Sequence, residues 1–154
     1  MASCRFAFAV HILAVLARHG AGGVTSQALA GSVNTNPVVI RRILAQLQRA
    51  GLVSTQKGAG AGSRIARQPD EISLGEVYRA VEPAPAFGVH PQQPNQRCCV
   101  GREIQRALGE VFAGAQEALE QALARRTLAD IAEKVGAAEP TPSLRARPTK
   151  RKAS

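Results

Sequence analysis

Two stretches of this chain space their apolar residues with the period of an α-helix. Residues 36–50 open with an Asn-Pro pair, which favours a helix start, and place apolar side chains at i, i+3, i+4 and i+7. Residues 100–126 show a 4-3-4-3-4 spacing, which is typical of a long helix packed on a partner helix. The apolar positions with this spacing are Ile104, Leu108, Val111, Ala115, Ala118 and Ala122. The predicted dimerisation contacts are Ile104, Leu108, Val111, Ala115 and the neighbouring Leu119.

Shorter patterns predict the elements that precede residue 36. Residues 6–17 are almost entirely apolar and predict a buried first helix, which we expect to end near Gly20. Thr25 is a suitable N-cap for a short helix over residues 26–30. Residues 31–33, Gly-Ser-Val, then predict a turn.

The segment after residue 50 predicts a β-hairpin followed by short helices. Residues 52–56 alternate as in a strand, residues 57–62 form a glycine-rich tip, and residues 63–67 return as a second strand. Capping boxes that begin at Ser73 and Thr127 each start a short helix.

This order of elements predicts a mainly α fold with a small β-hairpin, namely a winged helix-turn-helix domain plus a long dimerisation helix. We expect the DNA-binding domain to occupy residues 1–81 and a proline-rich loop to occupy residues 82–99. The dimerisation helix and a short terminal helix would span residues 100–136. Residues 137–154 are basic and lack periodic apolar positions, which predicts a disordered tail.

The distribution of charge points to a polyanionic partner. Residues 1–69 contain eight basic side chains and no acidic one, whereas residues 70–136 contain ten acids and seven bases. A domain that carries only positive charge attracts a phosphate backbone. Aromatic residues, on which single-stranded bases stack, make up only 3% of the chain, and this favours double-stranded DNA over RNA or single strands.

In a winged helix-turn-helix, the second helix enters the major groove and the glycine-rich hairpin approaches the backbone or the minor groove. Arg can read guanine, Asn can read adenine, and an exposed Val or Thr methyl group can touch thymine. The predicted DNA contacts are therefore Thr25, Ser26, Asn34, Thr35, Asn36, Val38, Arg41, Arg42, Lys57, Gly58, Gly60, Ser63 and Arg64.

The run from Leu29 to Leu44 resembles the helix-turn-helix of the IscR/NsrR/CymR family of bacterial regulators, the Rrf-two family. The resemblance continues through the wing and the long helix, and covers roughly residues 5–135. It implies a homodimer joined by the long helix, which binds an imperfect DNA palindrome, usually as a repressor. IscR-like members carry an acidic residue near the position of Arg41, so the resemblance also implies a different base preference here.

The three cysteines raise the question of a sensor. Cluster-binding members of the family spread three cysteines through the loop before the long helix, whereas this loop has only the adjacent pair Cys98 and Cys99. We therefore expect no metal and no iron–sulfur cluster, although a site completed by Cys4 or His11 remains an alternative. The favoured functional interpretation is a thiol switch, because Cys99 lies at the predicted helix N-terminus, where the helix dipole lowers a thiol pKa. Two ordinary cysteines are the equal alternative.

No nucleophile–base pair, carboxylate pair or phosphate-binding loop that we would assign to catalysis is present, and we predict that the protein is not an enzyme. The predicted function is a sequence-specific DNA-binding transcriptional regulator. A non-specific nucleic-acid or nucleoid-associated protein is the alternative. The apolar run at residues 6–17 is too short to span a bilayer, and we expect a cytoplasmic protein with no membrane partner.

Overall fold

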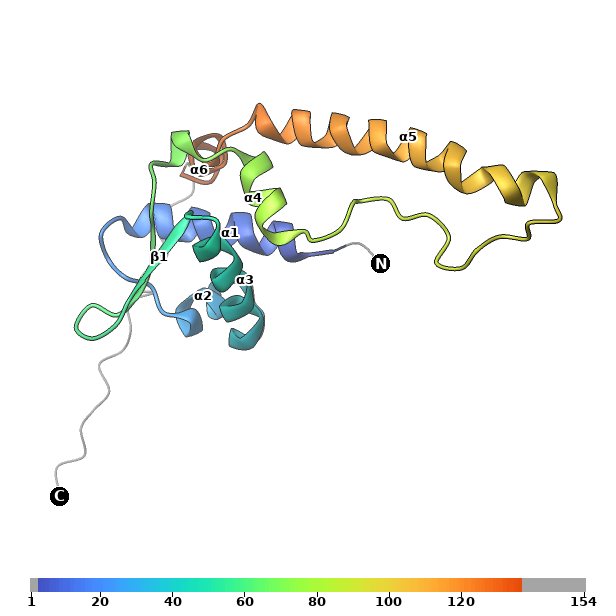
Figure 1. Cartoon of the computed structure of the whole chain (residues 1–154). Helices are drawn as coiled ribbons and strands as arrows, with labels where there is room; N and C mark the ends of the chain where they lie inside the picture. The colour runs from blue at the N-terminus through green and yellow to red at the C-terminus, as the bar shows by residue number, and fades with distance from the viewer. Residues whose placement is uncertain (1–2, 137–154) are drawn as a thin grey trace, which may run out of the picture.

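In the computed structural model, which describes residues 3–136, a small helical lobe carries one long projecting helix (Figure 1). The fold is mainly helical with a single antiparallel hairpin among the described residues, which confirms the predicted fold class. The elements in chain order are α1 (Arg5–His19), α2 (Ser26–Val33), α3 (Pro37–Arg49), β1 (Val53–Gln56), β2 (Gly62–Ile65), the 3₁₀ turn η1 (Pro69–Glu71), α4 (Leu74–Val81), α5 (Cys99–Ala124) and α6 (Leu128–Gly136).

One hydrophobic core holds the lobe together. α1 packs against α3, α4 and α6, and α3 packs against α2 and α4. The apolar stripe predicted for α3 forms the buried face of that helix, because its four residues are at most 8% exposed. The fully buried side chains that fill the centre are Ile12, Leu13, Leu16, Leu29, Ile40, Ile43, Leu47, Leu52, Ile72, Leu128, Val77 and Val81.

The turn between α2 and α3 lies later in the chain than the sequence predicts. α2 continues through Gly31 to Val33, and Asn34 is the residue that leaves the helix, in the left-handed conformation with φ of 59°. The N–H groups of Asn34 and Thr35 both donate to the carbonyl oxygen of Ala30, which satisfies the end of the helix. The prediction of a turn at residues 31–33 is therefore wrong.

The hairpin is fastened to the start of α2 by a third strand-like segment. β1 and β2 pair in antiparallel register from Val53 opposite Ile65 to Gln56 opposite Gly62, so each predicted strand is shifted or shortened at its ends. Val24 and Ser63 exchange two backbone hydrogen bonds of 3.0 and 2.9 Å. A Cβ atom on Gly62 would lie 2.7 Å from the Val24 nitrogen, so only glycine allows this approach.

The long helix joins the lobe at one end only. α5 packs on α4, where Gly75 lies against Ala124, and a Cβ atom on Gly75 would lie 3.2 Å from the Ala124 Cα atom. Away from this contact α5 projects from the lobe, and the loop that leaves α4 runs outward alongside it to the start of α5 (Figure 1). The two predicted capping boxes, at Ser73 and Thr127, are confirmed. The predicted disordered tail lies outside the described residues.

Candidate nucleic-acid interface

The exposed surface of α3 divides into two stripes of side chains. The wing-side stripe comprises Val38, Arg41, Ala45 and Gln48, and the Thr55 hydroxyl of β1 donates to the Gln48 amide oxygen at 3.4 Å. The α1-side stripe comprises Val39, Arg42, Gln46 and Arg49. At 100° per residue, the two stripes lie roughly 100° apart around the helix axis.

Two of the predicted polar contacts, Thr25 and Asn36, are the N-cap residues of α2 and α3, and their side chains accept hydrogen bonds from the first turn of each helix. The Thr25 hydroxyl accepts from the Ala28 N–H group at 3.1 Å, and the Asn36 side chain accepts from the Val38 N–H group at 2.8 Å. Asn34 and Asn36 are exposed on the turn, while Ser26 and Thr35 are half-buried beside them. The cap at Asn36 fixes the direction in which the first turn of α3, with Val38 at 47% exposure, meets solvent.

The tip of the hairpin presents some of the predicted contacts and hides one. Lys57, Gly58 and Gly60 are exposed, and both glycines have positive φ values. The Arg64 guanidinium folds back toward the Gly60 carbonyl oxygen at 3.4 Å. Ser63, whose backbone pairs with Val24, is only 3% exposed, so it offers little surface for the DNA contact that the sequence predicts.

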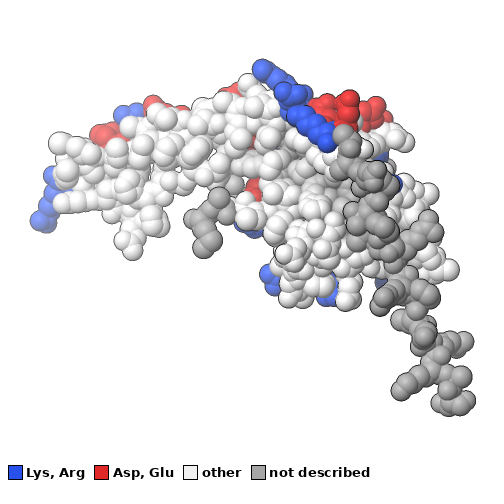
Figure 2. Space-filling model, turned by 180° about the vertical axis from the view of Figure 1, so that it is seen from behind, with Lys and Arg blue, Asp and Glu red and all other residues white. Residues whose placement is uncertain are grey.

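The basic side chains of the lobe are largely unpaired with acids. Among the described residues, Arg5 lies 3.8 Å from Glu82 and Arg67 lies 2.8 Å from Glu76. Within the same part of the chain, Arg41, Arg42 and Arg49 form no ion pair. Figure 2 shows small blue patches without red neighbours along the lower edge of the lobe, whereas blue and red atoms lie side by side at its upper edge.

The predicted dimerisation stripe lies on an open face of α5. No residue of this 26-residue helix is buried, and Val111 is 65% exposed. Ile104, Leu108, Ala115 and Leu119 are half-buried beside it. Val111 is therefore more open to solvent than the other four positions of the predicted stripe.

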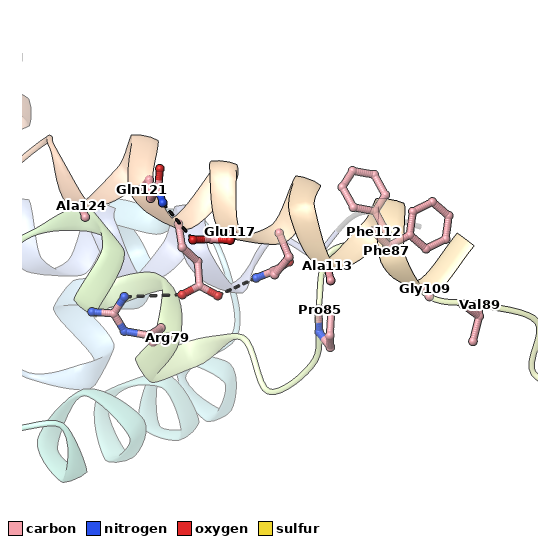
Figure 3. Close-up of a pocket in the computed structure, with 13 residues that line it drawn as sticks. Arg79, Pro85, Phe87, Val89, Gly109, Phe112, Ala113, Glu117, Gln121 and Ala124 are labelled. Carbon is pink, nitrogen blue, oxygen red and sulfur yellow. Dashed lines mark hydrogen bonds and ion pairs between the residues drawn. The ribbon is translucent and has the colours of Figure 1, made fainter. Parts of the chain in front are cut away.

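A different face of α5 meets the loop that precedes it. This face lines a groove of about 840 Å³, in which the Phe87 and Phe112 rings stack with centroids 5.5 Å apart (Figure 3). Arg79 lies toward the other end of the groove and pairs with Glu120 at 3.6 Å. The Ala86 N–H group donates to the Gln116 amide at 3.0 Å, and this bond helps hold the loop against α5.

The cysteine pair begins the long helix one residue earlier than predicted. Cys98 is the N-cap of α5 and Cys99 is its first residue, and both side chains are exposed. Hydrogen bonds from the backbone N–H groups of Gly101 and then Val100 lower the pKa of the Cys98 thiol. The lowered pKa therefore belongs to Cys98, whereas the sequence analysis favours Cys99 as the reactive thiol.

Three residues that shape this surface are not among the predicted DNA contacts. Gln48 belongs to the wing-side stripe, and Arg49 repeats the position of Arg42 seven residues later, a spacing that marks one helix face. Arg5 lies far away in sequence but lines the same cleft as Arg42 and Arg49. Only the fold could have placed Arg5 there.

A helix-turn-helix whose second helix, α3, presents one face to solvent, a glycine-tipped wing and a stretch of 69 residues without an acid together define a winged helix-turn-helix DNA-binding protein. The sequence profile of the Rrf2 family, described as "Iron-dependent Transcriptional regulator", matches residues 2–134. The chain belongs to this family of transcriptional regulators, whose function implies DNA binding, and is not an enzyme.

Individual relatives agree with this assignment. The chain is 41% identical over 132 residues to YwnA of Bacillus subtilis (strain 168), named as an HTH-type transcriptional regulator, and the match covers 85% of this chain and 96% of YwnA. A crystal structure described as that of a DNA binding protein is 39% identical and superposes with a TM-score of 0.67, over 82% of this chain and 97% of that one. The structure of T. potens IscR has the same fold, with 23% identity, a TM-score of 0.67 and 93% coverage of both chains.

The residues described here do not fit the iron that the family description implies. Within residues 3–136, no three His, Cys, Asp or Glu side chains come together in a metal-binding arrangement. Cys98 and Cys99 are neighbours on one helix end, and the His11 ring hydrogen-bonds to the Ser32 hydroxyl at 3.0 Å. Adjacent thiols alone do not supply the ligands that an iron–sulfur cluster needs.

Within residues 3–136, no helix has both the length and the apolar character needed to cross a bilayer.

Proposed function

We propose that this chain is a dimeric, sequence-specific repressor that binds an imperfect palindrome of double-stranded DNA. The observation that carries the proposal is the wing-side stripe of α3, on which Val38, Arg41 and Gln48 are exposed beside the wing. The first 69 residues contain no acidic side chain that would repel DNA from this stripe. In the complex, α3 lies in the major groove, and Arg41 reads a guanine.

The remaining contacts position the protein on the backbone. Thr25 and Ser26 at the start of α2, together with the turn residues Asn34 and Asn36, approach phosphates beside the groove. Lys57 and the glycines of the wing tip meet the adjacent backbone or minor groove. These contacts set register without carrying sequence information.

The homodimer is supported by the apolar stripe of α5. Val111, which is 65% exposed, lies in an apolar stripe with coiled-coil spacing, and a partner helix would remove this apolar side chain from solvent. A second copy of the same helix supplies a matching stripe, because a two-fold interface is self-complementary. Two such protomers present two α3 helices to successive half-sites of a palindrome.

Regulation by oxidation is the finer part of the proposal. Cys98 combines full solvent access with a lowered pKa, the two properties that make a thiol reactive toward oxidants. Because Cys98 caps α5, its oxidation would change the start of the dimerisation helix and hence the distance between the two α3 helices.

Selection of random duplex DNA on the purified, reduced protein tests the DNA-binding proposal. Enrichment of a two-fold symmetric motif is expected, and the motif is expected to be lost after mild oxidation. Cys98→Ser should keep the motif under both conditions, and Cys4→Ser serves as the matched control that still responds. Binding of all duplexes with equal affinity would instead favour the non-specific nucleic-acid protein.

Sedimentation or light scattering tests the dimer. Val111→Lys places a charge in the centre of the proposed interface and is expected to give a monomer. Ala113→Lys, on another face of the same helix, is the matched control and should remain dimeric. A dimer for Val111→Lys, or a monomer for the unaltered chain at working concentration, would refute the proposed interface.

A further inference from the structure

The α1-side stripe of α3 lines a cleft that the proposed base-reading surface does not include. Arg42, Gln46 and Arg49 lie at i, i+4 and i+7 on α3, and Arg5 from the first turn of α1 completes the wall. The cleft has a volume of about 430 Å³. It is therefore lined by three arginines from two helices that are distant in sequence.

Acidic groups among the described residues balance the charge of this cleft only in part. Glu82 is the nearest candidate, 3.8 Å from Arg5, and its side chain is 10% exposed. The same carboxylate accepts from the Ser3 hydroxyl at 2.7 Å and from the Phe6 N–H group at 3.3 Å, so it also caps α1. Arg42 and Arg49 pair with no acid in residues 3–136, which leaves a net positive cleft.

Three permanently charged guanidinium groups in one cleft repel each other unless an anion lies between them. Arginine forms two parallel hydrogen bonds with a phosphate, and this geometry suits a phosphodiester group. The α1-side stripe of α3 lines this cleft, roughly 100° around the helix from the wing-side stripe, so the cleft lies beside the proposed base-reading face. A helix lying in the major groove has one phosphate strand at each of its two sides.

We propose that Arg5, Arg42 and Arg49 form a binding site for the DNA backbone on the α1 side of α3, opposite the strand met by the wing. This inference rests on the proposed function. It assigns Arg42 to phosphate rather than to a base, and adds Arg5 and Arg49 to the interface. The site grips DNA of any sequence, while the wing-side stripe with Arg41 discriminates between bases.

The test uses the full chain with the double substitution Arg42→Gln/Arg49→Gln, which keeps long polar side chains but removes both charges. Fluorescence anisotropy measures affinity for the selected duplex and for a scrambled duplex between 50 and 200 mM salt. We expect both affinities to fall by a similar factor, about tenfold or more, and the salt slope to decrease by about two, since each phosphate contact contributes about 0.9. Arg18→Gln, an exposed arginine of α1 outside the cleft, is the matched control and should bind as the unaltered chain.

Several outcomes would overturn the phosphate site. A loss of affinity for the selected duplex alone would assign Arg42 and Arg49 to base reading. Unchanged affinity and slope, in a variant whose melting temperature shows that it is folded, would remove the cleft from the interface. Thermal stabilisation of the unaltered chain by inorganic phosphate, absent in the double variant and accompanied by an unchanged DNA slope, would assign the cleft to a small free anion.

Failure of the proposed function gives a different result. If the unaltered chain selects no motif, sequence-specific recognition is wrong, but the scrambled duplex still tests the cleft. A salt slope that falls by about two on that duplex would then support the phosphate site on its own.

Discussion

Replacing Gly62 with alanine should detach the wing from the helix-turn-helix. Gly62 has a φ of 136°, and its missing Cβ atom would lie 2.7 Å from the Val24 nitrogen and 2.8 Å from the Val24 oxygen. Both neighbours are backbone atoms in a paired segment and have little freedom to move. The alanine variant must therefore separate Val24 from Ser63 and break their two hydrogen bonds.

The expected loss of stability has two parts. Two backbone hydrogen bonds at about 0.5–1.5 kcal/mol each give about 1–3 kcal/mol. The positive φ adds a strain of about 1–2 kcal/mol for a residue with a side chain. The sum is about 2–5 kcal/mol, which corresponds to a fall in Tm of about 4–20 °C at roughly 2–4 °C per kcal/mol for a chain of this length.

Gly58→Ala is the control that separates the backbone strain of a positive φ from the steric clash of a Cβ atom with its neighbours. Gly58 also has a positive φ, 89°, but no atom lies within 4 Å of the Cβ position. Its replacement should cost only the strain, about 1–2 kcal/mol. Differential scanning calorimetry of both variants gives the comparison, and hydrogen exchange of the Val24 amide, which is bonded to Ser63, identifies the local cause.

The reasoning would be refuted if the two variants lost equal stability, or if the Val24 amide stayed protected in the Gly62→Ala protein. Either result would mean that the hairpin accommodates a Cβ atom without releasing α2. A lowered affinity for DNA should accompany the loss of protection, because the wing is then no longer held beside α3.

Three further predictions concern single side chains. Hydrogen bonds from the Arg67 side chain and from the Ser73 N–H group lower the pKa of Glu76. The carboxylate therefore stabilises the fold above its unfolded pKa of about 4.3 and loses this effect as the pH falls through its folded pKa. Glu76→Gln should lower Tm at pH 7 but not at pH 2–3, and an equal loss of Tm at both pH values would contradict this. Alkylation of Cys98 by iodoacetamide should reach half its maximal rate below the pKa of free cysteine, about 8.5, as followed by mass spectrometry, and a midpoint at or above 8.5 would argue against thiol activation. Asn34→Gly should leave stability within about 0.5 kcal/mol of the unaltered chain, whereas Asn34→Val should lose about 1–2 kcal/mol by urea denaturation, because a β-branched residue resists the left-handed conformation.

Local patterns predicted the elements of the fold well where one side of a helix is buried. The stripe of α3 and the capping boxes at Ser73 and Thr127 depend on residues three or four apart, so the sequence contains their whole cause. The predicted end of α2 was wrong because a glycine such as Gly31 destabilises a helix by only about 1 kcal/mol, and the burial of Leu29 and Ala30 offsets this cost.

The parts of the surface that depend on distant segments could not be predicted. Val24 and Ser63 carry no signal that they pair, and this pairing buries a serine that the sequence assigned to the interface. The sequence also grouped Arg41 with Arg42, since both lie outside the core stripe. Their separation into two stripes follows from where α1 and the wing meet α3.

Because α5 packs on the lobe at one end only, a small rotation at this contact moves its far end by a large distance. With a rise of 1.5 Å per residue, its 26 residues extend about 39 Å from the contact between Gly75 and Ala124 to the cysteine pair. A rotation of about 5° at that pivot would displace the far end by roughly 3 Å, a distance comparable with the rise of one base pair. In the proposed dimer, a small change in the angle between the two α5 helices would therefore shift the spacing of the two lobes by an amount that a palindrome can distinguish.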